Sequence, residues 1–299
     1  MTKSIVKYMT VFLASFLLIL FSSGNTSAQT YALSSDDSVI GINQHYTVAG
    51  RESLIEVARK YGIGFNSIHA ANRTLDEFIP GDGSEVLIPT SFIIPDEKKS
   101  SIIINLSEMR LYYFFSKGKS RYVSTFPIGI GTDIASTPTG TFKISHKTVN
   151  PSWYVPLSVQ EERPELPKIV PPGPENPLGT HAMRLSSSSY LIHGTHRPYG
   201  VGRRVSHGCI RLYPEHIPQL FSISAIGTKV TIIQQPVKVG QREGRVYISV
   251  HDDDHVQDFN YLGAAIGLLK QKNFLGRINT GRLYEAVELK LGYPVDITE

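Results

Sequence analysis

The first patterned block of the chain, Gln44 to Pro89, predicts two short strands with two helices between them. Ser53 and Glu56 form a capping box, the reciprocal pair of polar residues that opens a helix. The apolar residues that follow recur at helical spacing until Gly62, where the helix is expected to end. The expected elements are strands at 46–48 and 86–88 and helices at 54–61 and 66–72.

From residue 101 onward the pattern changes to strand-like segments separated by turns. Lys117-Gly118-Lys119 and Thr137-Pro138-Thr139-Gly140 are two of those turns, and a hairpin is expected around Gly244. The remaining helical periodicity lies near the end, at residues 256–271 and 281–291. The pattern therefore predicts an α+β fold that is mostly β. The expected strands are 102–105, 109–115, 122–126, 141–144, 190–192 and 229–233, with the last closing the sheet.

The segment from Pro151 to Pro177 stands apart because it holds eight of the chain's 18 prolines. Proline lacks an N–H and disrupts helix interiors and central strands, so this density predicts an extended loop without helix. Apolar residues such as Trp153 and Val170 would anchor the loop to the rest of the protein. A long ordered loop beside a catalytic strand often serves as a lid. Trp153 could either stack on a substrate or pin this lid.

The N-terminus has the pattern of a secretory signal peptide. Lys3 and Lys7 precede an apolar run, Met9 to Phe21, and small residues lead to a cleavage site after Ala28. The alternative is an uncleaved anchor, although the apolar run is short for a membrane span of roughly 20 residues. Export through a signal peptide would place the mature protein in the periplasm.

Composition and charge narrow the partners. The net charge of +4 is mild and no basic stripe is present, which argues against nucleic acid but suits an anionic surface such as the bacterial wall. The chain has one cysteine, Cys209, so no intramolecular disulfide can form. A free thiol in an oxidising compartment either has a chemical role or lies buried as a small apolar residue.

The residues around Cys209 favour a chemical role. A thiol attacks as its thiolate, and a neighbouring imidazole can take the proton to give a thiolate–imidazolium pair. His193, at the end of a predicted strand, can face Cys209 across a sheet, and His207 would share its side in an extended segment. Gly208 leaves room for substrate and for an oxyanion hole of backbone N–H groups. Arg211 suits a substrate carboxylate.

These residues resemble the catalytic motif of the L,D-transpeptidases, the YkuD-type fold. The motif's strand histidine and its Ser/Thr-His-Gly-Cys run match His193-Gly194-Thr195 and Ser206-His207-Gly208-Cys209. The resemblance implies that Cys209 is the nucleophile and His193 the base, oriented by the carbonyl of Gly194, with His207 and Gly208 in the catalytic loop. It also implies substrate contacts from a second group: Arg211, Ser206, Thr195 and Trp153.

The block from Gln44 to Pro89 resembles a LysM domain, a small module that binds glycans containing N-acetylglucosamine. The match includes Tyr46-Thr47-Val48, Ala71-Asn72 and Leu87-Ile88-Pro89. Most matching residues belong to the core of the module, so they predict its fold more directly than its affinity for sugar. We therefore expect a signal peptide at 1–28, a LysM-like module at 44–89, a YkuD-like β-sandwich catalytic domain at 100–234 and an α+β extension at 235–299.

The resemblance implies an acyl transfer in the bacterial wall that needs no cofactor or metal. The thiolate would attack the peptidoglycan tetrapeptide between diaminopimelate and D-alanine, and an amine would then resolve the thioester. The acceptor could be diaminopimelate of another stem or the C-terminal lysine of an outer-membrane lipoprotein. Water as acceptor would make the protein an L,D-carboxypeptidase.

Two alternatives belong to other functional classes. One is a zinc site built from His193, His196, His207 and Cys209, which leaves Arg211 and the predicted lid unexplained. The other is a peptidoglycan-binding protein without enzymatic activity, which would be favoured only if the nucleophile or base position were empty.

Overall fold

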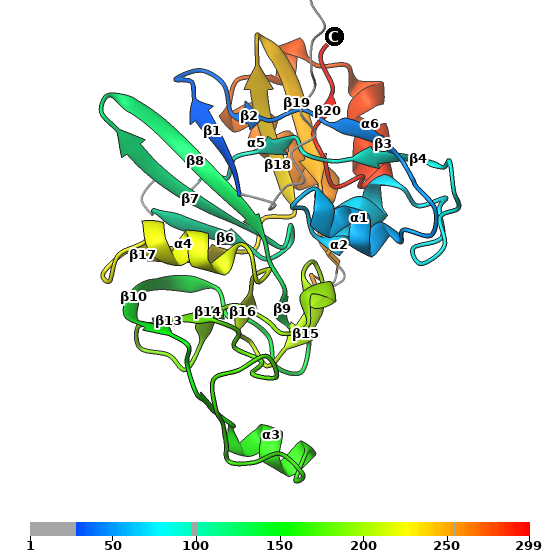
Figure 1. The fold of residues 1–299 in the computed structure, drawn as a ribbon. Helices are drawn as coiled ribbons and strands as arrows, with labels where there is room; N and C mark the ends of the chain where they lie inside the picture. Colours follow the sequence, from blue (N-terminus) through cyan, green and yellow to red (C-terminus); the bar gives the residue numbers. More distant parts are fainter. Residues whose placement is uncertain (1–27, 97–100, 254, 257) are drawn as a thin grey trace, which may run out of the picture.

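The computed structural model describes residues 28–96, 101–253, 255–256 and 258–299. The predicted signal peptide lies almost entirely outside the described residues. Within the described part of the chain, no helix has the length and apolar character needed to cross a membrane. The structure is mostly β, as the sequence predicted, and its largest element is a long mixed sheet (Figure 1).

Nine strands of the described chain form this sheet, and its two ends differ in role. The β7–β8 hairpin lies toward the first end, and the second end carries the motif residues. In spatial order the strands are β1 (Gln29–Leu33), β8 (Ser120–Pro127), β7 (Arg110–Lys117), β6 (Ile102–Asn105), β17 (Lys229–Ile233), β10 (Gly140–Val149), β13 (His181–Leu185), β14 (Leu191–His193) and β16 (Ile210–Arg211).

Strand β10 joins the two parts of the sheet. Its first residues, Gly140 to Lys143, pair with β17, whereas Ile144 to Val149 pair with β13, with a register shift between Ile144 and His146. The two parts enclose one apolar core, which contains Ile104 and Leu111 from the first part and Ile192 and Ile210 from the second. Helix α4 (Ile217–Ile223) contributes Ile217 and Leu220 to the same core. The result is the β-sandwich expected from the sequence.

The sequence placed residues 229–233 at the closing edge of the sheet, and this prediction is wrong. Strand β17 lies in the middle, between β6 and β10. All three central residues, Val230 to Ile232, are buried, as a strand with two neighbours requires. The edge strand is β16, whose Arg211 exchanges two backbone hydrogen bonds with Gly129 (2.8 and 2.9 Å).

The N-terminal block has the predicted order of elements: β3 (Gln44–Thr47), α1 (Leu54–Lys60), α2 (Phe65–Ala71) and β4 (Glu85–Ile88). Strands β3 and β4 pair antiparallel, and the capping box of Ser53 and Glu56 is present. The apolar core of this block also includes Tyr112 and Val123, which point out from the other face of β7 and β8. The block is therefore packed onto the large sheet.

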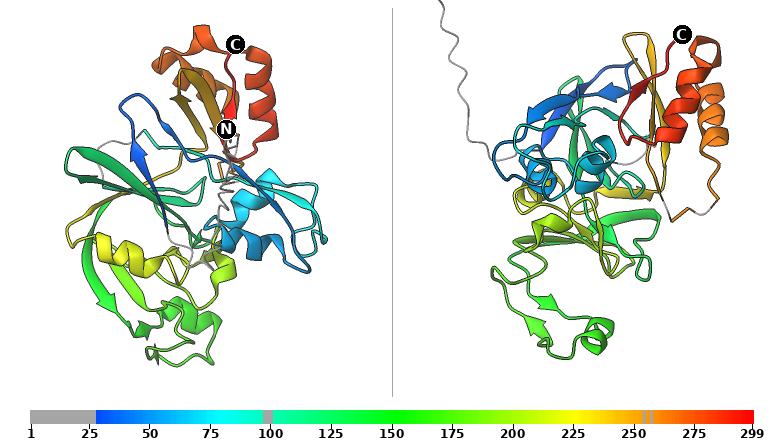
Figure 2. Two further views of the ribbon diagram at one scale, coloured as in Figure 1. Left: turned by 45° about the horizontal axis from the view of Figure 1, so that its top comes forward. Right: turned by 90° about the vertical axis from the view of Figure 1, so that its right-hand side faces the viewer.

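The C-terminal residues form a unit of their own that packs beside the N-terminal block (Figure 2). Its β18–β19 hairpin turns at Gly244, as predicted, and two helices cover the hairpin. The second predicted helix matches α6, whereas the first begins at Tyr261, later than its periodicity suggested. The bounds are β18 (Val237–Arg242), β19 (Arg245–Val250), α5 (Tyr261–Gln271), α6 (Thr280–Leu289) and β20 (Val295–Asp296).

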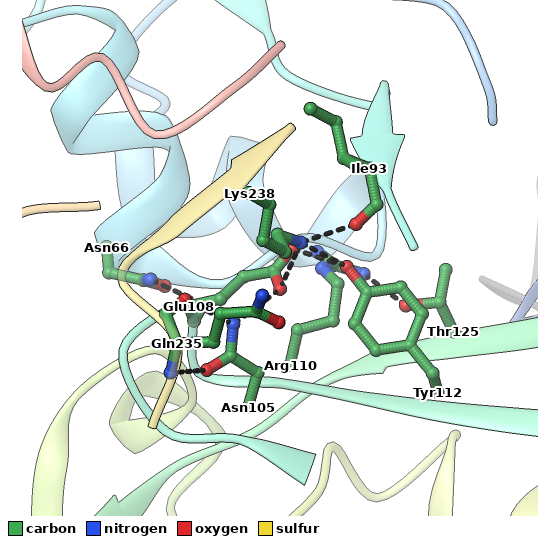
Figure 3. A network of polar contacts seen from close by, with 9 residues as sticks. All are labelled: Asn66, Ile93, Asn105, Glu108, Arg110, Tyr112, Thr125, Gln235 and Lys238. Atoms are coloured by element: carbon green, nitrogen blue, oxygen red, sulfur yellow. Dashed lines mark hydrogen bonds and ion pairs between the residues drawn. The ribbon is translucent and has the colours of Figure 1, made fainter. Parts of the chain in front are cut away.

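A buried charged network connects the three units (Figure 3). The ammonium group of Lys238, on β18, donates to Glu108 (2.7 Å) and to the carbonyl of Ile93 (2.5 Å), in the segment that follows the N-terminal block. Tyr112 also donates to the Glu108 carboxylate, and Asn66 of α2 donates to the Glu108 carbonyl (2.9 Å). Because Lys238 and Glu108 are almost fully buried, each charge depends on the other.

The proline-rich segment departs from the sequence prediction because it contains a helix. Helix α3 (Leu157–Glu162) lies between Pro156 and Pro164, in a stretch without proline. Strands β11 (Trp153–Tyr154) and β12 (Ile169–Val170) pair at its base. The prolines therefore delimit the helix instead of excluding it. This lid segment, residues 151–177, projects away from the body of the protein (Figure 2).

Candidate active site

Strand register brings Cys209 and His193 together on one face of the sheet. Strands β14 and β16 are parallel, and Ile192 lies beside Ile210 in the core. Since side chains alternate between faces, the residues before and after these two isoleucines share the opposite face. Cys209 is thus beside Leu191, which precedes His193 by two residues on the same strand. Arg211 lies directly across from His193.

His193 is held in a defined orientation. Its side chain is buried, and its Nδ1 lies 2.6 Å from the carbonyl oxygen of Gly194. A carbonyl only accepts, so Nδ1 carries the proton and a neutral ring keeps its lone pair at Nε2. Burial and the positive charge of Arg211 lower the pKa of His193 to about 3, against the opposing effect of the Gly194 and Leu178 carbonyls. The ring is therefore neutral at physiological pH.

The Cys209 thiol is also neutral at rest. Burial raises its pKa, although the Leu191 backbone N–H and the charges of Arg211 and Arg184 act in the opposite direction. Both pKa directions favour the uncharged thiol and the uncharged imidazole over a thiolate–imidazolium pair before substrate binds. Burial away from water disfavours the charged form of each group, so Cys209 as a thiol and His193 as a neutral imidazole would meet the substrate.

The loop that carries Cys209 is fixed by short contacts. Gly208 adopts a φ of +93°, and a Cβ there would lie 2.3 Å from the ring of Tyr190. Thr137 donates its hydroxyl to the Gly208 carbonyl (3.0 Å) and accepts from the N–H of Gly131 (2.9 Å). Ser206 is buried and donates to the carbonyl of Cys209 (2.6 Å). This bond uses the Ser206 hydroxyl proton within the loop.

The sequence analysis predicted that His207 would share one side of an extended segment with Cys209, and the structure places it differently. The left-handed backbone of Gly208 breaks the alternation of sides, and the exposed His207 ring turns away. Its Nε2 lies 3.2 Å from the Glu162 carboxylate, at the end of the lid helix α3. The geometry favours a contact between catalytic loop and lid over a proton transfer at the thiol.

The remaining predicted contact residues occupy different places. Thr195 is buried and bonds within its own turn, donating to the Arg197 carbonyl (3.3 Å). Trp153 is half-buried in β11, opposite Val170, at the base of the lid. The guanidinium of Arg211 is half-buried, and among the described residues its Nε has no hydrogen-bond partner.

Two hollows are lined by residues that neighbour the thiol and the imidazole. A cavity of about 400 Å³ is lined by Arg184 and Leu191 and, at the base of the lid, by Pro151, Ser152 and Tyr154. A larger groove of about 790 Å³ contains Arg211 and lies between the first turn of α1 and the 3-10 turn η1 (Pro198–Gly200). The two arginines therefore line separate hollows.

Sequence reasoning missed two residues that shape this region. Asn176 is fully buried, and its amide donates to the carbonyls of Pro151, Val170 and Pro171 at 2.9–3.2 Å. The lone asparagine among prolines in an otherwise extended segment was the available signal. Arg184 was missed because residues 181–185 were not predicted to form a strand, although β13 and β14 are consecutive antiparallel strands joined by residues 186–190.

The candidate zinc ligands do not converge. His207 contacts Glu162, whereas His196 lines the groove on the far side of Arg211. Across the part of the chain that the structure describes, no three His, Cys, Asp or Glu residues form a cluster that could hold a metal ion.

Comparison with known proteins identifies the family. Residues 99–232 match the model of the L,D-transpeptidase catalytic domain, YkuD. The chain is 35% identical to the Probable L,D-transpeptidase YcfS of Escherichia coli K12 over 276 residues, covering 87% of this chain and 85% of the relative. It is 37% identical to Probable L,D-transpeptidase YbiS of the same strain, covering 87% of each.

The solved structures give a more distant likeness. The catalytic domain of the Enterococcus faecium L,D-transpeptidase, determined by NMR, is 22% identical and aligns with a TM-score of 0.36, covering 46% of this chain and all of that one. The chain belongs to the L,D-transpeptidase family, as the sequence motifs predicted. The likeness of residues 44–89 to LysM stays a prediction, as do the domain boundaries.

Proposed function

We propose that the protein is a cysteine acyltransferase that uses the tetrapeptide stem of peptidoglycan as its acyl donor. The observation that carries this proposal is the placement of Cys209 and His193 on one face of neighbouring strands, with Nδ1 of His193 held by the Gly194 carbonyl. A neutral imidazole with its lone pair at Nε2 can accept a thiol proton.

The proposed first half-reaction forms a thioester. As the Cys209 sulfur attacks the carbonyl between diaminopimelate and D-alanine, its proton passes to His193. The carbon–nitrogen bond then breaks, and the imidazolium returns that proton to the amine of the departing D-alanine. Backbone N–H groups at Gly208 and Cys209 are the candidate donors to the oxyanion.

The second half-reaction transfers the acyl group to an amine. The amine attacks the thioester, His193 takes its extra proton, and the thiol is restored when that proton returns to sulfur. Both candidate acceptors, diaminopimelate and a C-terminal lysine, carry a carboxylate close to or linked with their amine. Arg211, which lies across from His193 and lines the groove beside η1, is the candidate partner for that carboxylate.

The setting of the proposal is the periplasm. The predicted signal peptide and the LysM-like block are consistent with an enzyme that works on the glycan-linked peptides of the wall. Ser206 and Thr195, whose hydroxyl groups bond to nearby carbonyls, are better suited to shape the site than to bind substrate. Trp153 keeps a proposed place at the lid base, near the donor.

The test is the mass spectrometric analysis of products from disaccharide-tetrapeptide, with and without a lysine-ended acceptor peptide. We expect D-alanine release with a new amide, whose mass identifies the acceptor, and no product from Cys209→Ala. Release with water alone would make the protein an L,D-carboxypeptidase. No release under any condition, with retained binding to sacculi, would favour the non-enzymatic alternative.

A further inference from the structure

A row of four side chains crosses the sheet and ends at the catalytic cysteine. His146 of β10 pairs with Arg184 of β13, and Arg184 pairs with Leu191 of β14. Leu191 lies beside Cys209, because Ile192 pairs with Ile210 in parallel register. All four share the face opposite the buried Met183, Ile192 and Ile210. Arg184 is therefore on the same face as the thiol, two strands away.

Arg184 also lines the cavity of about 400 Å³ beneath the lid base. The other lining residues are polar or apolar, and no Asp or Glu is among them. Within the described ranges of the chain, no acidic side chain forms an ion pair with Arg184, and its side chain is exposed. The cavity thus presents a guanidinium that has no counter-charge from the protein.

The spacing suits a group one residue beyond the attacked carbonyl. Neighbouring strands lie about 4.8 Å apart, so the Cα atoms of Arg184 and Cys209 are separated by roughly 10 Å. A long arginine side chain spans much of that interval and leaves space for a small anionic group beside the thiol. Guanidinium groups bind carboxylates through paired hydrogen bonds, which fixes orientation as well as charge.

The other arginine near the thiol is differently placed. Arg211 lies across from His193, is half-buried, and faces the groove between α1 and η1. Arg184 and Arg211 therefore line different hollows near the nucleophile. A donor peptide and an acceptor amine each need a side of their own, and both carry carboxylates.

We propose that Arg184 binds a carboxylate of the donor stem peptide in the cavity under the lid and thereby selects stems that end one residue after the attacked carbonyl. This inference rests on the proposed function, because it assumes that the stem is the acyl donor. The carboxylate belongs either to the terminal D-alanine or to the side chain of diaminopimelate, and the former lies closer to the attacked bond.

The first measurement is the affinity of tetrapeptide for the Cys209→Ala protein, by calorimetry, with and without Arg184→Gln. This binding measurement does not depend on turnover. We expect Arg184→Gln to weaken binding by about 10- to 100-fold, the effect of losing a charge-assisted hydrogen-bonded pair. Arg121→Gln, at an exposed position of the distant β8 strand, is the matched control and should leave affinity unchanged.

Two amidated peptides identify the carboxylate. One has a C-terminal amide on D-alanine, and the other has an amide on the side-chain carboxylate of diaminopimelate. The peptide that lacks the recognised carboxylate should bind weakly to the Cys209→Ala protein that keeps Arg184. Adding Arg184→Gln should not reduce the affinity for that peptide any further. We expect this for the D-alanine amide, and finding it for the diaminopimelate amide would move the contact to that residue.

Equal affinity for the unmodified tetrapeptide with and without Arg184→Gln would overturn the inference. The inference would also be overturned if, for both amidated peptides, Arg184→Gln weakened binding by the same factor as it does for the unmodified tetrapeptide. In the Cys209 enzyme, Arg184→Gln should raise the KM for the donor far more than it lowers kcat, and Arg184→Lys should restore part of the affinity. Failure of the proposed function would be recognised separately, as absence of D-alanine release from the unsubstituted enzyme.

Discussion

At the scale of single residues, burial acts on both the proposed base and the proposed nucleophile. Burial lowers the pKa of His193 to about 3 and raises the pKa of Cys209, so neither group ionises near neutral pH. Protons would therefore move only as the sulfur attacks. An exposed thiolate, by contrast, would be open to oxidation in an oxidising compartment.

This state predicts how the thiol responds to pH and to removal of the base. Alkylation of Cys209 by iodoacetamide should be slow at neutral pH and should accelerate as pH rises through the raised pKa of the thiol. His193→Ala should lower the alkylation rate near pH 7 by about tenfold or more, because no base then assists the thiol. The measurement is the pseudo-first-order alkylation rate across pH 5–10.

His207→Ala is the matched comparison for this experiment. Since the His207 ring contacts Glu162 of the lid, the substitution should change the neutral alkylation rate by less than about threefold. A loss with His207→Ala and none with His193→Ala would transfer the role of base to His207. A rate plateau extending below pH 6 would instead indicate a preformed ion pair.

At the scale of elements, the lid depends on one buried amide. Asn176 connects three carbonyls at the base of the proline-rich segment and accepts from the N–H of Leu178 (2.9 Å). Leu178 in turn contributes a carbonyl near His193. The anchor of the lid and the surroundings of the base are thus only two residues apart.

Replacing this amide should loosen the lid without unfolding the protein. Asn176→Ala should lower the free energy of unfolding by about 2–3 kcal/mol, because buried carbonyls lose their donors. It should also increase proteolytic cleavage within residues 151–177 and raise the KM for the donor. Ser158→Ala, on the exposed side of α3, should have none of these effects. An Asn176→Ala protein with an equally resistant lid would contradict this role.

Element boundaries show which parts of the fold are readable from sequence. The capping box at Ser53 and the turns at Gly118 and Gly244 depend on neighbouring residues, and the structure has each of them. The central position of β17 and the row from His146 to Cys209 depend on pairing between distant segments. A single sequence carries no signal for such pairing. Arg184 was missed for a local reason, because residues 181–185 were not predicted to form a strand.

At the scale of the whole molecule, three apolar clusters are connected by buried charges. The core of the N-terminal block includes Tyr112 and Val123 of the large sheet, and Lys238 of the C-terminal hairpin reaches Glu108. Local pattern predicted helices and strands within these units but could not predict the contacts that couple the units. We infer that deletion of residues 44–89 would expose these sheet residues and destabilise the catalytic part.

The buried pair of Lys238 and Glu108 allows the coupling between the C-terminal hairpin and the large sheet to be measured. Lys238→Met should lower the free energy of unfolding by about 3–5 kcal/mol, because it leaves the Glu108 carboxylate buried without its cation. Adding Glu108→Gln should recover part of the loss, since it removes the carboxylate that Lys238→Met leaves without its ammonium partner; the recovery is partial because Arg110 stays buried beside this position. Chemical denaturation provides the measurement, with Lys119→Met in the exposed β7–β8 turn as control. Losses that simply add would contradict coupling between the two groups.

The most direct test of the central claim is to trap the acyl-enzyme. The protein is mixed with tetrapeptide in the absence of acceptor amine, quenched in acid, and examined by intact-protein mass spectrometry followed by peptide mapping. We expect a mass increase equal to the stem without its terminal D-alanine, located on Cys209 and absent from Cys209→Ala. Release of D-alanine by a Cys209→Ala protein, or an adduct on another residue, would contradict it.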